Sequence, residues 1–429
     1  MFKSAIRHIE AVVIPRIPID YYPIMPGFVA PAVNPTKVTK RRKALPAVWM
    51  RAGTSKGLYL HRQDLPQSQD EWTPIITGIM GSYDCDPKQL NGIGGATSTT
   101  SKVAVVARSQ RPGVDVDYTF VQVPIGSPKL DLTGNCGNIA SGVGPFAVDE
   151  GIVKAKPGQQ EVQVRVFNTN TNSLLIENVQ VDEEGHFLED GDCILPGLRS
   201  MGSRVKMAFS KPSGAMTGKL LPTGRPTDII FGQTAAEPTP IPVQVSIVDA
   251  ANPFVFVNEL SLPNCFREQG PGAAESIEFI ESVRRQAAVL MGLASSVEKA
   301  ALTRGTPKIA ILKEPESQEG APSPDVEVVA YSMGKVHGSL QLTGAVCLGT
   351  AACTEGTLAH SIRNRSRISE KVQLGLGTNG PLDLEQIKLR HPGGDMDVDI
   401  RLGTDGEAEE VTVFRTARRL FEGTVYYLG

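Results

Sequence analysis

TSTTSKVAVV at residues 97–106 and TRGTPKIAIL at residues 303–312 are similar stretches that lie 206 residues apart. Each runs from a polar turn through a lysine, Lys102 or Lys308, into an apolar run rich in β-branched residues. An apolar run of this kind after a turn is typical of a β-strand. Similarity at a long, fixed spacing indicates an internal repeat.

A second pair of segments repeats in the same order and at nearly the same spacing. CGNIASGVGPFAVDEG at 136–151 corresponds to QLTGAVCLGTAACTEG at 341–356, 205 residues further on. Both start with polar residues, continue through Ala and Gly and end on Glu-Gly, where glycine suits the left-handed end of a helix. Small residues along a whole helix indicate close packing on every side. We therefore expect an α+β fold of two copies of one domain, related by a pseudo-twofold, each a curved sheet or barrel around a central helix.

Alternating apolar and polar residues predict further strands, for example at 161–167 and 242–248. The N-terminal region is basic and rich in proline, which fits either a targeting segment or, as we favour, an extension that lies outside the folded core. The predicted divisions are this extension, a first domain that a C-terminal strand completes, and a second domain: residues 1–45, 46–235 with 415–429, and 236–414.

Composition excludes several classes of protein. The 429 residues carry a formal net charge of -3, so no global field attracts nucleic acid or membranes. No apolar run approaches the length of a membrane span. The six cysteines are scattered without zinc spacing, so neither a disulfide framework nor a metal site is expected. A reducing compartment follows, and we expect the cytoplasm rather than mitochondria.

The starts of the two predicted helices are candidates for anion binding. A helix N-terminus presents unpaired N–H groups and a partial positive charge, so two facing starts would hold a compact polyanion. One start carries Cys136 and the other Gln341. A thiol at such a position ionises readily and can act as acid or base, whereas a packed core cysteine is the alternative interpretation.

Lys102 is the second candidate for proton transfer. A lysine at the start of a strand is commonly a solvated surface residue, but partial desolvation beside a ligand would let it carry protons. The polar turn RAGTSKG at 51–57 lies at another strand start. It lacks the spacing of a nucleotide-binding P-loop, so a nucleotide site is not expected.

Eight motifs together resemble those of the PrpF family: MRAGTSKG (50–57), GGATSTTSKVAV (94–105), GNCGN (134–138), NTNT (168–171), LLPTG (220–224), DAANP (249–253), TGAVC (343–347) and RTAR (415–418). The resemblance spans about residues 46–429. It implies two diaminopimelate-epimerase-like domains with the site between them, and no cofactor or metal. The family's catalytic lysine and cysteine fall on Lys102 and Cys136.

The resemblance also implies the substrate class. Family members isomerise aconitate, methylaconitate or methylitaconate, or tautomerise oxalomesaconate. We expect a small tricarboxylic acid as partner, with a homodimer left open. The expected substrate-binding residues are Thr54, Ser55, Lys56, Ser98, Thr99, Asn135, Gly137, Asn138, His337, Gln341, Thr343, Gly344 and His391.

One departure from the wider superfamily bears on the reaction. Epimerases of this fold place a cysteine at each helix start, whereas here Gln341 corresponds to Cys136. A two-thiol epimerase is therefore not expected. We expect instead an allylic proton shift that converts cis-aconitate to trans-aconitate. The alternatives are a methylitaconate or methylaconitate isomerase, an oxalomesaconate-type tautomerase, and a polycarboxylate-binding protein without activity.

Overall fold

A computed structural model of the chain describes residues 41–236, 238–315, 323–374 and 384–429. The strands of its N-terminal half, with the last strand of the chain, are β1 (Arg42–Ala52), β2 (Ser55–His61), β3 (Lys102–Arg108), β4 (Val116–Gln122), β5 (Glu161–Asn168), β6 (Ser173–Gln180), β7 (Cys193–Ile194), β8 (Met201–Gly202), β9 (Val205–Ser210) and β19 (Ala417–Leu428). The strands of the second half are β10 (Asp228–Gly232), β11 (Ile241–Ala250), β12 (Asn252–Asn258), β13 (Lys308–Lys313), β14 (Val326–Ser332), β15 (Lys335–Val336), β16 (Leu384–His391), β17 (Gly394–Leu402) and β18 (Ala408–Arg415). The α-helices are α1 (Trp72–Met80), α2 (Gly137–Ala140), α3 (Val143–Asp149), α4 (Cys265–Glu268), α5 (Ala274–Leu290), α6 (Val297–Leu302), α7 (Leu342–Cys353) and α8 (Leu358–Leu374).

The two halves repeat one pattern of strand pairing. In the first half the order is β19-β1-β2-β3-β4-β5-β6-β9, with parallel pairs at β2–β3 and β4–β5. In the second half the order is β10-β11-β12-β13-β14-β16-β17-β18, with parallel pairs at β12–β13 and β14–β16. β9 pairs with β18, so the two halves form one continuous sheet. Lys102 and Lys308 begin corresponding strands, β3 and β13, as the repeat in the sequence predicts.

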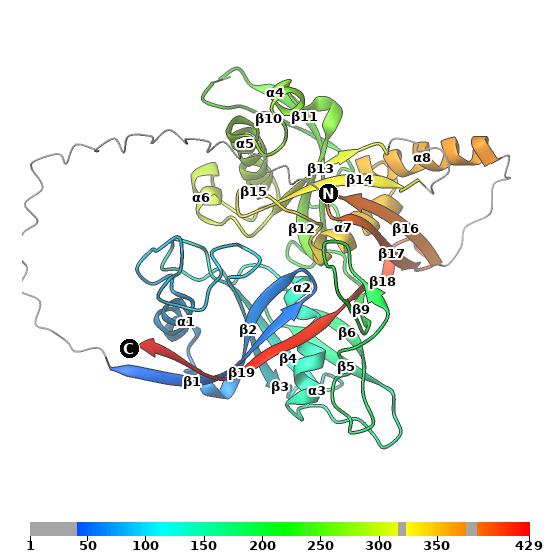
Figure 1. Cartoon of the computed structure of the whole chain (residues 1–429). Helices are drawn as coiled ribbons and strands as arrows, with labels where there is room; N and C mark the ends of the chain where they lie inside the picture. The colour runs from blue at the N-terminus through cyan, green and yellow to red at the C-terminus, as the bar shows by residue number, and fades with distance from the viewer. Residues whose placement is uncertain (1–40, 237, 316–322, 375–383) are drawn as a thin grey trace, which may run out of the picture. The chain divides into compact units, whose positions relative to one another are not determined.

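Each half curves its strands around a central helix (Figure 1). α7 packs against β11, β12, β16, β17 and β18, and its residues from Leu342 to Ala352 are all buried. α2 and α3 occupy the same place in the first half and pack against β1 to β6. The predicted fold class, α+β with two similarly built halves, is confirmed.

The central helix of the first half is interrupted, which corrects the expectation of one continuous helix over 136–151. α2 ends at Ala140 and α3 begins at Val143. Pro145 has no N–H with which to bond the carbonyl of Ser141, so a regular helix cannot run through this point. The N–H of Gly142 bonds the carbonyl of Ile139 at 3.1 Å, and the Ser141 hydroxyl donates to the carbonyl of Asn138 at 2.8 Å.

Both faces of the strands that begin with the two lysines are buried, which explains their unbroken apolar runs. In β3, Ala104 and Val106 face the core around the central helices, whereas Val103 and Val105 pack on the side of α1. β13 alternates in the same way between the central core and the side of α5. The strand starts are thereby fixed at the edge of the central core.

The ends of the described chain are paired. Arg42 lies opposite Leu428, and β1 and β19 pair along their length, side by side in Figure 1. β10 pairs with β11 of the second half, although it precedes residue 235, where the sequence predicts the boundary between the two domains. Within the described ranges, no helix is both long and apolar enough to cross a membrane.

Candidate active site

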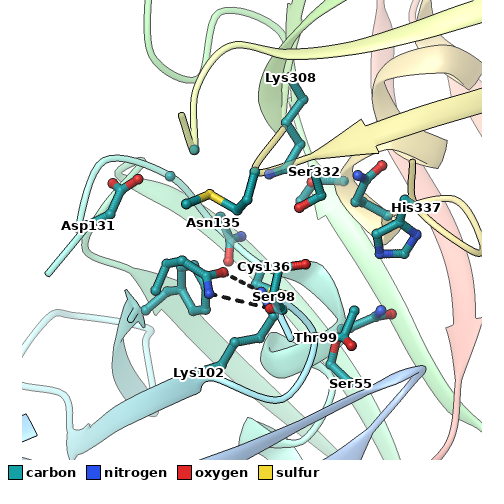
Figure 2. Close-up of a pocket in the computed structure, with 18 of the residues that line it drawn as sticks. Ser55, Ser98, Thr99, Lys102, Asp131, Asn135, Cys136, Lys308, Ser332 and His337 are labelled. Carbon is teal, nitrogen blue, oxygen red and sulfur yellow. Dashed lines mark hydrogen bonds between the residues drawn. The ribbon is translucent and has the colours of Figure 1, made fainter. Parts of the chain in front are cut away.

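A cavity opens where the central helices of the two halves begin (Figure 2). Its lining comes from both halves: Ser55, Ser98, Thr99, Lys102, Phe120, Gln122, Asp131, Gly134, Asn135, Cys136 and Asn138 from the first, and Arg304, Gly305, Lys308, Ser332, Met333, His337, Gln341, Leu342 and Thr343 from the second. Three basic side chains and one carboxylate are in this lining. The cavity is therefore suited to an anion.

Lys102 is held in place at the cavity floor by the neighbouring strand. Its side chain is buried, and Nζ donates to Oε1 of Gln122 at 2.6 Å. The Gln122 amide is fixed in turn, because its Nε2 donates to the carbonyl of Ser101 at 2.9 Å. Nζ also lies 5.0 Å from the centroid of the Phe120 ring, a distance at which a ring face attracts a cation. Lys102 thus presents an oriented amine to the cavity.

Cys136 lies between the two lysines in Figure 2. It is partly exposed and immediately precedes α2, with extended backbone angles. The next residue must be glycine, because a Cβ atom on Gly137 would lie 2.5 Å from Cδ2 of Leu342. The starts of α2 and α7 therefore abut, which brings Cys136 and Gln341 into one cavity.

Several buried polar atoms around the cavity have no hydrogen-bond partner among the described residues. They include both amide atoms of Asn135, Oε1 of Gln341 and the hydroxyl of Thr343, although all three residues line the cavity. The Nε2 of Gln341 is used, since it donates to the carbonyl of Tyr331 at 3.0 Å. Native proteins rarely leave buried polar groups unpaired, so these atoms indicate a polar ligand.

His337 borders the cavity as a neutral imidazole. Its Nδ1 lies 2.6 Å from the carbonyl oxygen of Ser339 and 3.1 Å from the backbone nitrogen of Ser339, so the ring is held in place by its own loop. Burial lowers the pKa of His337 to about 4, and the charges of Lys102 and Lys308 contribute. At neutral pH this side chain can accept a hydrogen bond and adds no positive charge.

A chain of side-chain contacts runs behind the cavity and connects the halves. Nε of Arg415 donates to Oδ1 of Asn138 at 3.0 Å, and Nδ2 of Asn138 donates to the Thr54 hydroxyl at 2.9 Å. That hydroxyl lies 3.4 Å from the hydroxyl of Ser339. Asn138 is thereby oriented, and the loop that carries His337 is tied to the first half.

Ten of the predicted contact and catalytic residues line the cavity: Ser55, Ser98, Thr99, Lys102, Asn135, Cys136, Asn138, His337, Gln341 and Thr343. Five predicted contact residues lie outside this lining: Thr54, Lys56, Gly137, Gly344 and His391. Thr54 supports Asn138, and the Lys56 side chain is exposed. The two glycines allow close packing, since a Cβ atom on Gly344 would lie 2.7 Å from Phe254.

His391, the last of the five, is buried, and its Nδ1 accepts from the backbone N–H of Gly393 at 3.0 Å. Burial, Arg415 and His337 lower its pKa to about 4.

The structure adds lining residues that were not predicted from the sequence: Phe120, Gln122, Asp131, Gly134, Arg304, Gly305, Lys308, Ser332, Met333 and Leu342. A signal for Lys308 was present, because the repeat places it opposite Lys102. Gln122 is the last residue of β4, which pairs with β3, and Ser332 is the last residue of β14, which pairs with β13. Their positions beside the two lysines depend on strand register, which short motifs do not reveal.

Known proteins of similar sequence are isomerases. The chain is 36% identical over 395 residues to the 3-methylitaconate isomerase of Eubacterium barkeri, covering 89% of this chain and 97% of the relative. It is 32% identical to the 2-methyl-aconitate isomerase of Cupriavidus necator, covering 90% and 97%. A solved structure of methylitaconate-delta-isomerase matches with a TM-score of 0.67 and 34% identity, over 90% of this chain and 96% of that one.

This chain is accordingly an isomerase, and the cavity between its two similarly built halves is its candidate active site. The family model described as PrpF protein matches residues 42–428. The chain belongs to the PrpF family.

Proposed function

We propose that the protein shifts the double bond of aconitate by proton transfer and converts cis-aconitate to trans-aconitate. The observation that carries this proposal is the lining of the cavity. Lys102, Lys308 and Arg304 approach it from both halves, beside buried polar groups that lack a partner. A compact tricarboxylate would supply acceptors for the basic groups and for the Asn135 amide N–H.

The reaction needs a base, an acid and a stabiliser of negative charge. The base removes a proton from the methylene group next to a carboxylate, and the electron pair spreads through the double bond into the far carboxylate. A proton then returns at the other end of the three-carbon unit. We assign Lys102 and Cys136 to carry protons. Fixed donors aimed at the developing dienolate stabilise it, commonly the largest contribution to catalysis.

Aconitate carries a carboxylate on each of its three chain carbons. A shift of its double bond therefore regenerates the same constitution, and the product differs only in cis or trans geometry. This feature makes isotope exchange the sharpest probe, because the carbon that receives the returning proton acquires hydrogen from an exchangeable group.

The test is incubation of cis-aconitate with the protein in deuterated water, followed by proton NMR. We expect trans-aconitate to accumulate with deuterium in its methylene group. A heat-inactivated sample controls for spontaneous isomerisation. Absence of both geometric conversion and deuterium incorporation would refute aconitate as the substrate.

The second candidate is a substrate with a methyl or oxo group on the same skeleton, such as methylitaconate, methylaconitate or oxalomesaconate. The names of the similar proteins favour this class, and the apolar Phe120, Met333 and Leu342 in the lining could contact such a group. Running these acids in parallel separates the candidates by kcat/KM. We further propose a cytoplasmic location, because the six cysteines are all free.

A further inference from the structure

We propose that Lys308 is a catalytic base of this active site, which takes up the substrate proton from the side opposite Lys102. The inference rests on the proposed proton-transfer function and extends it. Gln341 corresponds to Cys136 in the second half, but its amide does not carry protons. Lys308 would therefore give the second half its part in proton transfer.

The repeat places the two lysines equivalently. Lys102 is the first residue of β3 and Lys308 the first of β13, and both line the same cavity. Figure 2 shows them on opposite sides, with Cys136 between. A planar substrate bound there would be approached by an amine from each half.

The surroundings of the two amines differ. Lys102 donates to Gln122, the residue opposite it in the register of β3 and β4. Ile309 lies opposite Tyr331, so the residue at the corresponding place beside Lys308 is Ser332, whose side chain is shorter. In the part of the chain that the structure describes, the Lys308 ammonium has neither a hydrogen bond nor an ion pair.

The surroundings of Lys308 also affect its protonation. Burial and, less strongly, the charge of Lys102 lower the pKa of Lys308, whereas Cys136 and Asp131 oppose the shift, and the resulting pKa is about 8. About a tenth of Lys308 is then neutral at pH 7, enough to act as a base.

Other charged groups also face Lys308. Arg304 and Lys308 line both the main cavity and a smaller one behind it, where Glu281 and Arg284 of α5 form an ion pair. His337 borders the main cavity in its neutral form.

The neutral Lys308 amine forms an N–H bond as the methylene C–H bond breaks, and the electron pair of that bond becomes the dienolate. The Cys136 thiol or the Lys102 ammonium then protonates the far carbon. After one turnover the substrate has the same number of protons, Lys308 has gained one proton, and Cys136 or Lys102 has lost one. Both groups return to their starting state by proton exchange with water.

Lys308→Arg tests the proposal directly. A guanidinium keeps the positive charge that attracts carboxylates but does not lose its proton in proteins. We expect kcat to fall about 100-fold or more, with KM within about threefold of the unmodified protein. The limb of the kcat/KM profile near pH 8, which rises as Lys308 loses its proton, should disappear. Lys206→Arg, at an exposed lysine on β9, is the matched control and should change neither kcat nor the pH profile.

Chemical rescue distinguishes loss of the amine from a general packing defect in the variant. Lys308→Ala should be inactive and should regain turnover with added methylamine, in proportion to the free-base concentration of that amine. Retention of kcat and of the pH limb in Lys308→Arg, or a folded Lys308→Ala that methylamine does not rescue, would overturn the assignment. If the unmodified protein converts none of the candidate acids, the proposed function fails and this inference fails with it.

Discussion

Lys102 and Gln122 lie opposite each other in register on β3 and β4, and Nζ of Lys102 donates to Oε1 of Gln122 at 2.6 Å. Gln122 is anchored by its own bond to the carbonyl of Ser101. The backbone of Gln122 also bridges to Asp131, another lining residue. One residue of a neighbouring strand thus orients a candidate catalytic amine and ties it to the rim of the cavity.

Single substitutions of Lys102 and Gln122 should distinguish loss of the proton carrier from loss of its orientation. Lys102→Ala should abolish most turnover, because it removes a proposed proton carrier. Gln122→Leu leaves the amine but not its orientation, and should lower kcat by about tenfold with a smaller change in KM. Steady-state kinetics measure both, with Gln163→Leu at an exposed position of β5 as control. A Gln122→Leu variant with unchanged kcat would show that the hydrogen bond does not position Lys102.

Cys136→Ser should lower turnover by about 100-fold or more, because a hydroxyl of similar size is a far weaker acid and a far weaker base. Substrate binding should survive, since the cavity keeps its shape and its basic groups. Cys85→Ser, at an exposed cysteine outside the cavity lining, is the control. The measurement is kcat alongside a calorimetric dissociation constant, and unchanged turnover would remove Cys136 from the mechanism.

Gln341→Ala should weaken ligand binding by roughly 1–3 kcal/mol, the cost of leaving a ligand group without its buried partner. The amide Nε2 is held by the carbonyl of Tyr331, so its remaining hydrogen and the unpaired Oε1 are available to the ligand. An amide does not titrate in this range, so the pH dependence of kcat should be unchanged. A shifted apparent pKa in the pH–rate curve would contradict this role.

Glu177 should make stability depend on pH. It is fully buried, its Oε2 accepts from the N–H of Gly144 at 2.9 Å, and burial raises its pKa to about 8. A raised folded-state pKa gives stability that is complete below the unfolded value and is lost as pH rises through the folded value. In the unmodified protein this group should lower the free energy of unfolding as pH rises from about 5 to about 9, and Glu177→Gln should abolish that decrease. Chemical denaturation at both ends tests this, and an equal fall in the variant would point to other groups.

The extension predicted from the sequence should be dispensable, but the cut must respect β1. Arg42 pairs with Leu428 and Leu45 with Val425, so the strand begins before residue 46. A chain that starts at Arg41 should keep both fold and activity, whereas one that starts at residue 46 loses the first pairs of this strand and should melt at a lower temperature. Loss of activity in a folded chain starting at Arg41 would give the preceding segment a role.

Much of the fold was predictable because its signals are local or repeated. The strands that begin at Lys102 and Lys308 are apolar on both faces, and the small residues of 342–352 fit a helix enclosed by a sheet. The interruption at Ser141 and Gly142 also has a local cause, since Pro145 removes one helical hydrogen bond. The pairing of β9 with β18, which joins the halves, depends on contacts between residues far apart in the chain.

The sequence by itself determined the candidate proton carriers and the doubling of the site, because a lysine before an apolar strand and a cysteine before a small-residue helix are visible as short motifs. Only the tertiary structure decided how each residue is used. Strand register places Gln122 beside Lys102 as its hydrogen-bond partner. Beside Lys308 the same register places Ser332, whose side chain is shorter. Contact with Leu342 requires a residue without a Cβ atom at Gly137. Cross-strand partners, burial and close approach between halves arise when distant segments pack, and local sequence patterns do not encode those distances.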